Sequence, residues 1–228
     1  MNPISPVIKI HLKHKLTWIG MPWIILLSSF FINLIIAFLI GDKAGFYTGG
    51  LVSIFIYMFV AGMVTLNQTF SFSLGLSVRR KDYFFGTLTV IVMASILSAI
   101  VLSLLSYLES SVTSGWGYNL HFFSLLHSFD ANSFWQFWIF FVVLINTSLS
   151  GFVISGIFIR FGWPGMYIFF LIAAILLSVI TFACTYFHWW STLFHWVADH
   201  PNMLAFDLLI LSLIYAVLSY LFLRKATV

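Results

Sequence analysis

Residues 20–41 read GMPWIILLSSFFINLIIAFLIG and contain no charged side chain. A helix needs about 20 predominantly apolar residues to cross the hydrocarbon layer of a bilayer, which is roughly 30 Å thick. Lys9, Lys13 and Lys15 precede the stretch, as basic residues do in a signal peptide, but no small-residue cleavage site follows it. We therefore predict that residues 20–41 form a retained membrane-spanning helix.

Further apolar runs of similar length follow along the chain. With the first, they predict six spans over about 20–41, 49–70, 85–108, 134–158, 166–187 and 203–223. The chain is 62% hydrophobic and 7% charged, whereas a soluble domain carries roughly 25% charged residues. The predicted fold class is an all-α integral membrane protein, in which residues 1–228 form a single transmembrane domain.

The lysines and arginines lie between alternate spans. If the N-terminus is cytoplasmic, nine of the ten cations are cytoplasmic, namely Lys9, Lys13, Lys15, Arg79, Arg80, Lys81, Arg160, Arg224 and Lys225, and Lys43 lies outside. Most acids lie on the outer side, namely Asp42, Glu109, Asp130, Asp199 and Asp207, whereas Asp82 lies inside. Because cationic flanks stay in the cytoplasm, both termini are predicted to be cytoplasmic. Topology thus explains the basic charge, and no nucleic-acid partner is expected.

The predicted spans carry no charge near their middle, whereas ion-coupled carriers rely on intramembrane ionisable groups. The chain also lacks a G-x-x-x-x-G-K-[ST] phosphate loop and the G-x-S-x-G and H-E-x-x-H motifs. We therefore expect neither an ion-coupled carrier nor an enzyme, and no cofactor bound by this chain. Polar uncharged residues within the spans are expected to hydrogen-bond between helices or, alternatively, to line a pathway: Asn33, Asn67, Gln68, Asn146, Thr147 and Ser148.

Histidines are the remaining candidates for metal binding. His11 and His14 are predicted near the inner face, and His121, His127, His188, His195 and His200 lie in outer segments. The last three, with Asp199, could converge, but their spacings of seven and five residues match no standard ligand pattern. We predict no metal site, and we predict that Cys184, within an apolar run, is a small buried hydrophobe.

Two segments beside the spans have amphipathic patterns. Residues 4–18 combine apolar Ile4, Val7, Ile8 and Leu12 with basic Lys9 and Lys13, although Lys15 falls on the apolar face. This pattern predicts a helix along the inner surface, beside anionic lipid. In residues 187–202, the spacing of Trp190, Leu193, Phe194 and Val197 matches one helix face at the outer interface.

The inner loop over residues 71–86 is longer and more apolar than a simple connection requires. A positive-inside anchor accounts for Arg79, Arg80 and Lys81. It does not account for the apolar residues beside them, Leu74, Leu76, Tyr83, Phe84 and Phe85. A short amphipathic helix here would present apolar knobs and guanidinium groups to a cytoplasmic protein.

The stretch from Leu74 to Gly86, LGLSVRRKDYFFG, resembles the L-G-x-[ST]-R-R-x-[FY] loop of ABC-2 type transporter permeases, with Val78 inserted before the first Arg. The resemblance implies an ABC-2 (type V exporter-like) permease fold in a bacterial cell membrane. It also implies that the loop couples the permease to a cytoplasmic ABC ATPase dimer, which binds the ATP and Mg. The implied coupling residues are Leu74, Gly75, Leu76, Ser77, Arg79, Arg80, Asp82, Tyr83 and Phe84.

On this interpretation the chain is a permease subunit that pairs with a second copy or a related permease. The aromatic, uncharged spans favour export of an amphipathic or hydrophobic substrate, such as a peptide, an antibiotic or a lipid-like molecule. The alternative is a membrane interaction protein that transports nothing, such as a sensor partner or assembly factor. An adjacent gene that encodes a Walker motif would favour the permease.

Overall fold

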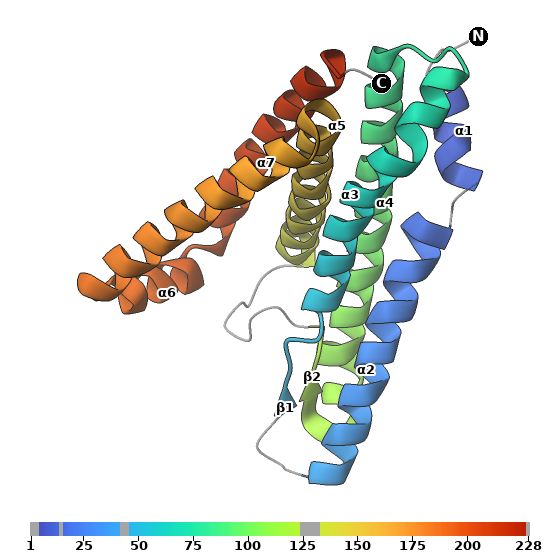
Figure 1. Cartoon of the computed structure of the whole chain (residues 1–228). Coiled ribbons are helices and arrows are strands. Elements are labelled where there is room, and N and C mark those ends of the chain that lie inside the picture. The colour runs from blue at the N-terminus through green and yellow to red at the C-terminus, as the bar shows by residue number, and fades with distance from the viewer. Residues whose placement is uncertain (1–4, 14–15, 42–45, 124–132, 227–228) are drawn as a thin grey trace.

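The computed structural model describes residues 5–13, 16–41, 46–123 and 133–226 (Figure 1). Within these ranges, five helices are long and apolar enough to cross a membrane, namely Leu16–Ile40, Val52–Gly75, Arg80–Val112, Phe134–Tyr186 and Pro201–Arg224. The chain thus has the architecture of an all-α, multi-pass membrane protein.

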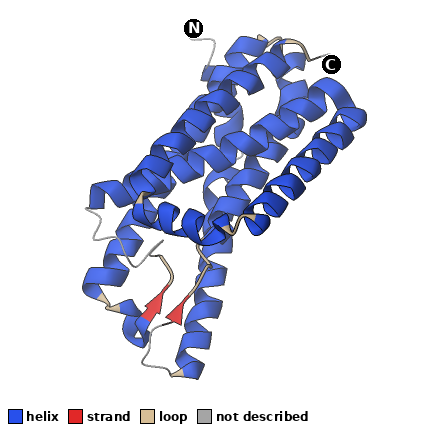
Figure 2. Cartoon of the chain, turned by 90° about the vertical axis from the view of Figure 1, so that its left-hand side faces the viewer, coloured by secondary structure: helices blue, strands red, loops and turns tan. Residues whose placement is uncertain are grey.

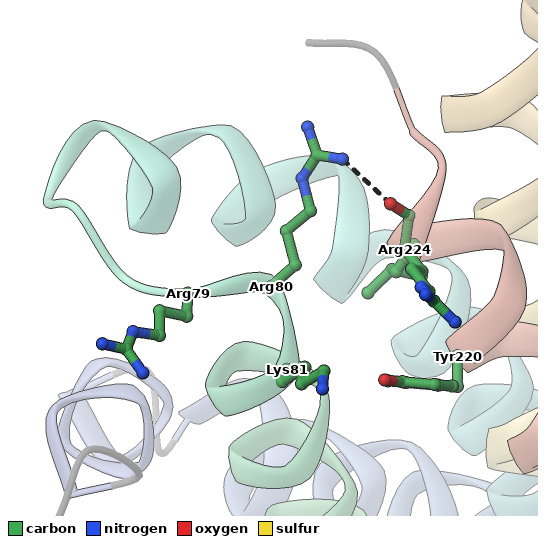
Figure 3. Close-up of a pocket in the computed structure, with 6 residues that line it drawn as sticks. Arg79, Arg80, Lys81, Tyr220 and Arg224 are labelled. Atoms are coloured by element: carbon green, nitrogen blue, oxygen red, sulfur yellow. Dashed lines mark hydrogen bonds between the residues drawn. The ribbon is translucent and has the colours of Figure 1, made fainter.

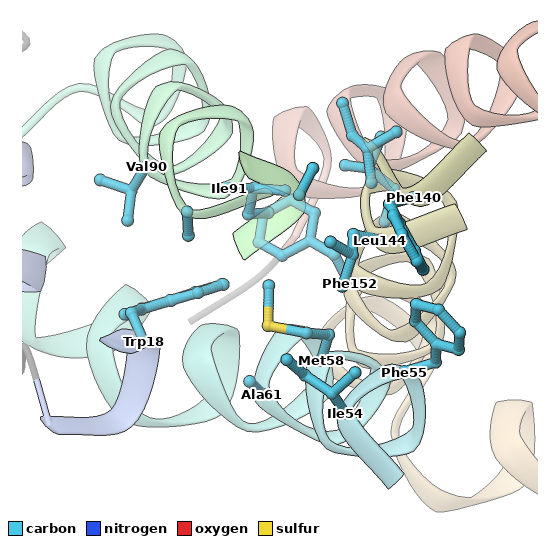
Figure 4. Packing of buried hydrophobic residues seen from close by; sticks show 14 of the residues in the cluster. Trp18, Ile54, Phe55, Met58, Ala61, Val90, Ile91, Phe140, Leu144 and Phe152 are labelled. Atoms are coloured by element: carbon cyan, nitrogen blue, oxygen red, sulfur yellow. The ribbon is translucent and has the colours of Figure 1, made fainter. Parts of the chain in front are cut away.

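The centre of the bundle is the first half of α5 (Ser133–Tyr186), which packs against α3 (Val52–Gly75), α4 (Arg80–Tyr107) and α7 (Pro201–Arg224). Two glycines bring the α3 and α5 backbones together. A Cβ at Gly62 would lie 2.1 Å from the Ser148 carbonyl oxygen, and one at Gly151 would lie 2.0 Å from the Phe59 carbonyl oxygen. Small residues allow this close approach between membrane helices. Large side chains of α3, α4 and α5 fill the space on either side (Figure 4).

Helix α5 contains 54 residues and would be about 80 Å long if it were straight. It is broken at Gly162, where φ is 65° and ψ is −159°, and Pro164 follows. This backbone conformation is essentially restricted to glycine. The two halves of α5 diverge from this break (Figure 1). The break lies beside the end of α7, since the Arg160 guanidinium carbon is 5.7 Å from the Phe222 ring centroid.

The N-terminal elements lie along the α3–α4 side. Helix α1 (Ser5–Lys13) packs on α4, since a Cβ at Gly86 would lie 2.7 Å from Val7 side-chain atoms. The π-helix η1 (Leu16–Gly20) buries Trp18 and leads into α2 (Met21–Ile40), much of which is exposed. The described part of the predicted amphipathic segment therefore packs partly on protein, through Val7 and His11, while Lys9 and Lys13 are exposed. Ile4, His14 and Lys15 lie outside the described residues.

Short elements close the opposite end of the bundle (Figure 2). Strand β1 (Phe46–Tyr47) pairs in parallel with β2 (Leu120–His121), which follows the π-helical elements η2 (Leu108–Val112) and η3 (Gly115–Asn119). Helix α6 (Trp189–Asp199) joins α5 to α7. Asp42, Lys43, His127 and Asp130, which were predicted on this side, lie outside the described residues.

The helices around the predicted loop 71–86 are longer than the apolar runs. Helix α3 continues to Gly75, α4 begins at Arg80, and only residues 76–79 connect them. The prediction of a separate short amphipathic helix here was wrong. Phe70, Ser73, Tyr83 and Phe84 are buried against the bundle, and this packing extends both helices beyond the runs that hydropathy identifies.

Candidate functional site

The α3–α4 connection is a compact, exposed tip. Ser77 has a left-handed backbone with φ of 60°. Its N–H donates to the Leu74 carbonyl over 2.9 Å, and the Val78 N–H donates to the Ser73 carbonyl over 3.1 Å. This pair of bonds is the Schellman motif, in which glycine usually occupies the left-handed position. The tip is therefore a defined turn that ends α3 abruptly and starts α4 only three residues after Ser77.

Three consecutive cations begin α4. Arg79 is the extended N-cap and makes no side-chain cap, while Arg80 and Lys81 occupy the first two helical positions. The helix dipole disfavours positive charge at a helix N-terminus, so local helix stability does not explain these residues. Asp82, also in the first turn, offsets part of this cost. The cations instead give the tip a strongly basic surface.

Tyr83 joins this tip to the helices on one side. Its side chain is fully buried, and its hydroxyl oxygen lies 2.7 Å from the Thr69 hydroxyl oxygen on α3. Its ring centroid is 5.2 Å from that of Phe70 and 6.2 Å from that of His11 on α1. His11 is itself buried, with Nε2 at 3.0 Å from the Thr87 hydroxyl oxygen. Tyr83 thus connects α4 to both α1 and α3.

Phe84 joins the tip to the helices on the other side. Consecutive helical residues point about 100° apart, so Phe84 faces away from α1. Its ring centroid is 6.4 Å from that of Phe152 on α5 and 5.3 Å from that of Tyr220 on α7. The first turn of α4 therefore contacts helices on both sides of the bundle directly beneath the exposed tip.

The structure divides the predicted coupling residues into two groups. Gly75, Leu76, Ser77, Arg79 and Arg80 are exposed, and Leu74 and Asp82 are half-buried. Tyr83 and Phe84 are buried, so the prediction that they act as knobs on an outside protein was wrong. They were grouped with the exposed residues because they are adjacent in sequence, but they follow the start of α4 and face its interior side. Phe85, by contrast, is 49% exposed.

A pocket of about 400 Å³ lies between the start of α4 and the end of α7 (Figure 3). It is lined by Arg79, Arg80, Lys81, Tyr220, Leu223 and Arg224. An Nη atom of Arg80 donates to the Arg224 carbonyl oxygen over 3.0 Å, and so caps the C-terminus of α7. The pairing of Arg224 with the α4 cations was not evident from sequence, since the two segments are 144 residues apart.

The polar residues of the spans have three kinds of environment. Asn146 donates to the Leu208 carbonyl over 3.1 Å and so links α5 to α7, as expected for an interhelical bond. Asn33, Thr147 and Ser148 donate to carbonyls of their own helices. Asn67 and Gln68, about two turns before the end of α3, are both exposed.

Glu109 was predicted only as one of the acids on the outer side, but it organises the end of the bundle that carries β1 and β2. Its carboxylate is buried, and Oε2 accepts hydrogen bonds from the Phe122 N–H, the Phe123 N–H and the Trp116 indole N–H, each over 3.0 Å. A single acid directly after a long apolar run was the available signal. Its partners are seven to fourteen residues away, and only the folded loop brings them to it.

The three histidines around α6 do not converge on one point. His188, His195 and His200 lie at the start, middle and end of α6, and no group of three His, Cys, Asp or Glu residues in the described part of the chain could hold a metal ion. The predicted face of α6 is largely exposed, at 40% for Trp190, 43% for Leu193 and 65% for Phe194. Cys184, at the end of α5, is 6% exposed.

Comparisons with known proteins add no relative: no family model, curated protein or solved structure matches this chain. The class of the protein is defined by the fold alone: it is an all-α, multi-pass membrane protein, because five helices among the described residues are long and apolar enough to cross a membrane. Within that class, the basic tip, with Tyr83 and Phe84 buried beneath it, is the candidate functional site.

Proposed function

We propose that this chain is the permease subunit of an ABC transporter and exports an amphipathic or hydrophobic substrate with energy from a separate ATPase. The observation that carries the proposal is the exposed tip over residues 75–81, backed directly by Tyr83 and Phe84. A partner that pushes on this tip would move a turn that contacts α1, α3, α5 and α7. A loop that only connected two helices would not need such contacts.

The arrangement of the ends supports a six-span topology with both termini in the cytoplasm. Helix α1, the α3–α4 tip and the C-terminal end of α7 lie at one end of the molecule, and the β1–β2 pair lies at the other (Figures 1 and 2). The α5 break lies at the first of these ends, since Arg160 is beside Phe222 of α7. On this topology, α5 crosses the membrane twice, before and after Gly162. The basic tip then lies in the cytoplasm, where an ATPase reaches it.

The exposed amides of Asn67 and Gln68 support a second permease subunit. An amide side chain that faces hydrocarbon without a partner costs several kcal/mol, so these side chains favour a polar neighbour. A second copy or a related permease packed on this face of α3 supplies one, either by direct hydrogen bonds or by a shared aqueous pathway.

The mechanism is two-state switching with the energy supplied in trans. ATP and Mg bind to the ATPase dimer, and its closure displaces the tip of each permease. The displacement passes through Tyr83 to α1 and α3, and through Phe84 to α5 and α7. Because these contacts are made by adjacent residues of one rigid turn, both sides of the bundle move together.

Docking is tested by co-purifying the tagged chain with the ATPase encoded beside it. The double variant Leu76→Ser with Arg79→Ala changes two exposed residues of the tip. It should abolish both co-purification and stimulation of the ATPase. The matched control is Lys9→Ala with Lys13→Ala, which changes exposed cations of the neighbouring helix α1 and leaves residues 75–81 intact. Full assembly by the tip variant would contradict the proposal, and assembly without ATP-dependent transport would favour the interaction-protein alternative.

The subunit contact is tested by cysteine crosslinking. Cys184 is the only cysteine in the sequence, so Cys184→Ala provides a cysteine-free background in one change. In that background, Gln68→Cys should form a disulfide-linked dimer in membranes, while Phe31→Cys on the exposed face of α2 serves as the control. Equal crosslinking at both positions would show random collision and would contradict the proposed interface.

A further inference from the structure

The pocket between α4 and α7 has the chemistry of an anion site. Lys81 and the Arg224 side chain extend on the side of Tyr220, whereas Arg79 points the opposite way and Arg80 reaches the α7 backbone (Figure 3). The nearby acid in the α4 first turn, Asp82, is not among the residues that line the pocket. Like charges that share a small volume repel each other, so an anion bound between Lys81 and Arg224 would lower their energy.

The position of the pocket selects the kind of anion. It lies where two candidate membrane-spanning helices end, at the first residues of α4 and the last residues of α7. Tyr220 and Leu223 give it an apolar wall, and the ring of Phe85, 49% exposed, lies beside Tyr220 with the centroids 6.4 Å apart. Val217, almost one turn from Tyr220 toward the middle of α7, is 59% exposed. Apolar surface therefore continues from the cationic end into the span.

We propose that this pocket binds the phosphate headgroup of an anionic phospholipid from the cytoplasmic leaflet. Lys81 and Arg224 contact the phosphate, Arg80 holds α7 in place, and the acyl chains lie along Phe85 and Val217. Basic pockets at the cytoplasmic ends of membrane helices bind anionic headgroups in this manner. The site ties the start of α4 to the end of α7, and it requires membrane insertion but no ATPase.

The test is native mass spectrometry of the full chain in neutral detergent. Phosphatidylglycerol and phosphatidylcholine with the same acyl chains are titrated separately, so that the headgroup is the only difference. The wild-type chain should retain phosphatidylglycerol preferentially. Lys81→Gln with Arg224→Gln should weaken that binding roughly tenfold or more, from the loss of two charges near the headgroup, and should leave phosphatidylcholine binding unchanged.

Two further variants distinguish binding at this pocket from a general effect of surface charge and from misfolding. Lys9→Gln with Lys13→Gln removes the same charge at the same end of the molecule and should leave binding unchanged. Lys81→Arg with Arg224→Lys keeps both charges and should retain binding, which ties the loss to charge. An unfolding temperature of the Lys81→Gln and Arg224→Gln variant equal to that of the wild-type chain excludes misfolding as the cause. If the Lys9 and Lys13 variant lost phosphatidylglycerol binding to the same extent, general surface charge would account for the binding. That result would overturn the proposal.

The remaining outcomes concern the source of the anion. If millimolar inorganic phosphate displaces phosphatidylglycerol as well as excess lipid does, the pocket is a free-phosphate site and the lipid proposal fails. If the Lys81 and Arg224 variant retains phosphatidylglycerol but no longer co-purifies with the ATPase, the pocket belongs to a protein interface and the lipid proposal also fails. Because the lipid test uses the chain alone, a negative result leaves the proposed transport function standing.

Discussion

The hydroxyl oxygens of Tyr83 and Thr69 lie 2.7 Å apart in the buried space between α4 and α3. The Thr69 hydroxyl also donates to the Thr65 carbonyl over 2.8 Å, so Tyr83 is the donor in its bond to Thr69. The bond lies directly beneath the exposed tip, and it fixes the angle at which the first turn of α4 meets α3.

Two substitutions at Tyr83 should separate the hydrogen bond from the ring. Tyr83→Phe should lower the free energy of unfolding by about 1 kcal/mol, because the ring contacts remain and Thr69 keeps its carbonyl partner. Tyr83→Ala should lower it by about 3–5 kcal/mol, because it leaves a cavity among α1, α3 and α4. Thermal unfolding of the purified chain in detergent measures both, and similar losses would show that the ring packing contributes little.

Gly62→Ala should separate α3 from α5. The new Cβ would meet a backbone carbonyl, which cannot rotate away, so we expect a loss of about 1–3 kcal/mol from overpacking. Gly75→Ala is the matched control, since nothing lies within 4 Å of a Cβ there. Detergent unfolding temperatures compare the two, and an unchanged Gly62→Ala variant would mean that the two helices do not approach closely.

Gly162→Ala should strain the break in α5. The backbone conformation at this position costs a residue with a Cβ about 1–3 kcal/mol, and the variant should unfold earlier or lose the angle between the two halves. Gly156→Ala, in the same helix, should be tolerated because its nearest contact would be 3.5 Å. Distances measured by electron paramagnetic resonance between spin labels at the exposed positions 134 and 176, one on each half of α5, would report the angle. If Gly162→Ala left both this distance and the unfolding temperature unchanged, the expectation would be contradicted.

Glu109→Gln should loosen the outer loop. The amide keeps one acceptor oxygen but places an N–H₂ group among three N–H donors, which should cost about 1–3 kcal/mol. Hydrogen–deuterium exchange at the Phe122 and Phe123 amides should accelerate. Ser110→Ala, at the exposed neighbouring position, should leave exchange unchanged, and slow exchange in both variants would show that the carboxylate does not hold the loop.

The long apolar helices were predictable because hydropathy is a local property. The apolar run over residues 20–41 matches α2 to within one residue at each end. The run over residues 49–70 underestimates α3 at its C-terminal end, because the last turn of α3 contains Ser71, Ser73 and Gly75, which a hydropathy window excludes. The gap between the fourth and fifth predicted spans covers residues 159–165, and the backbone breaks within it at Gly162.

The candidate site was predictable only in part. The basic residues of the tip were recognised from their charge, and charge is visible in the sequence. The burial of Tyr83 and Phe84 was not, because a residue's exposure depends on which neighbouring helices pack against its side of the helix. The contribution of Arg224 was also missed, since no local pattern relates the end of α7 to the start of α4.

By itself, the sequence determined that this chain is a helical membrane protein with a basic loop between its second and third apolar runs, because composition and run length depend on nothing beyond the chain. Only the tertiary structure decided which residues of that loop are exposed, that Glu109 holds residues 116–123, and that Lys81 and Arg224 share a pocket. These are relations between segments distant in sequence, and helix packing creates them when α5 brings α3, α4 and α7 around itself.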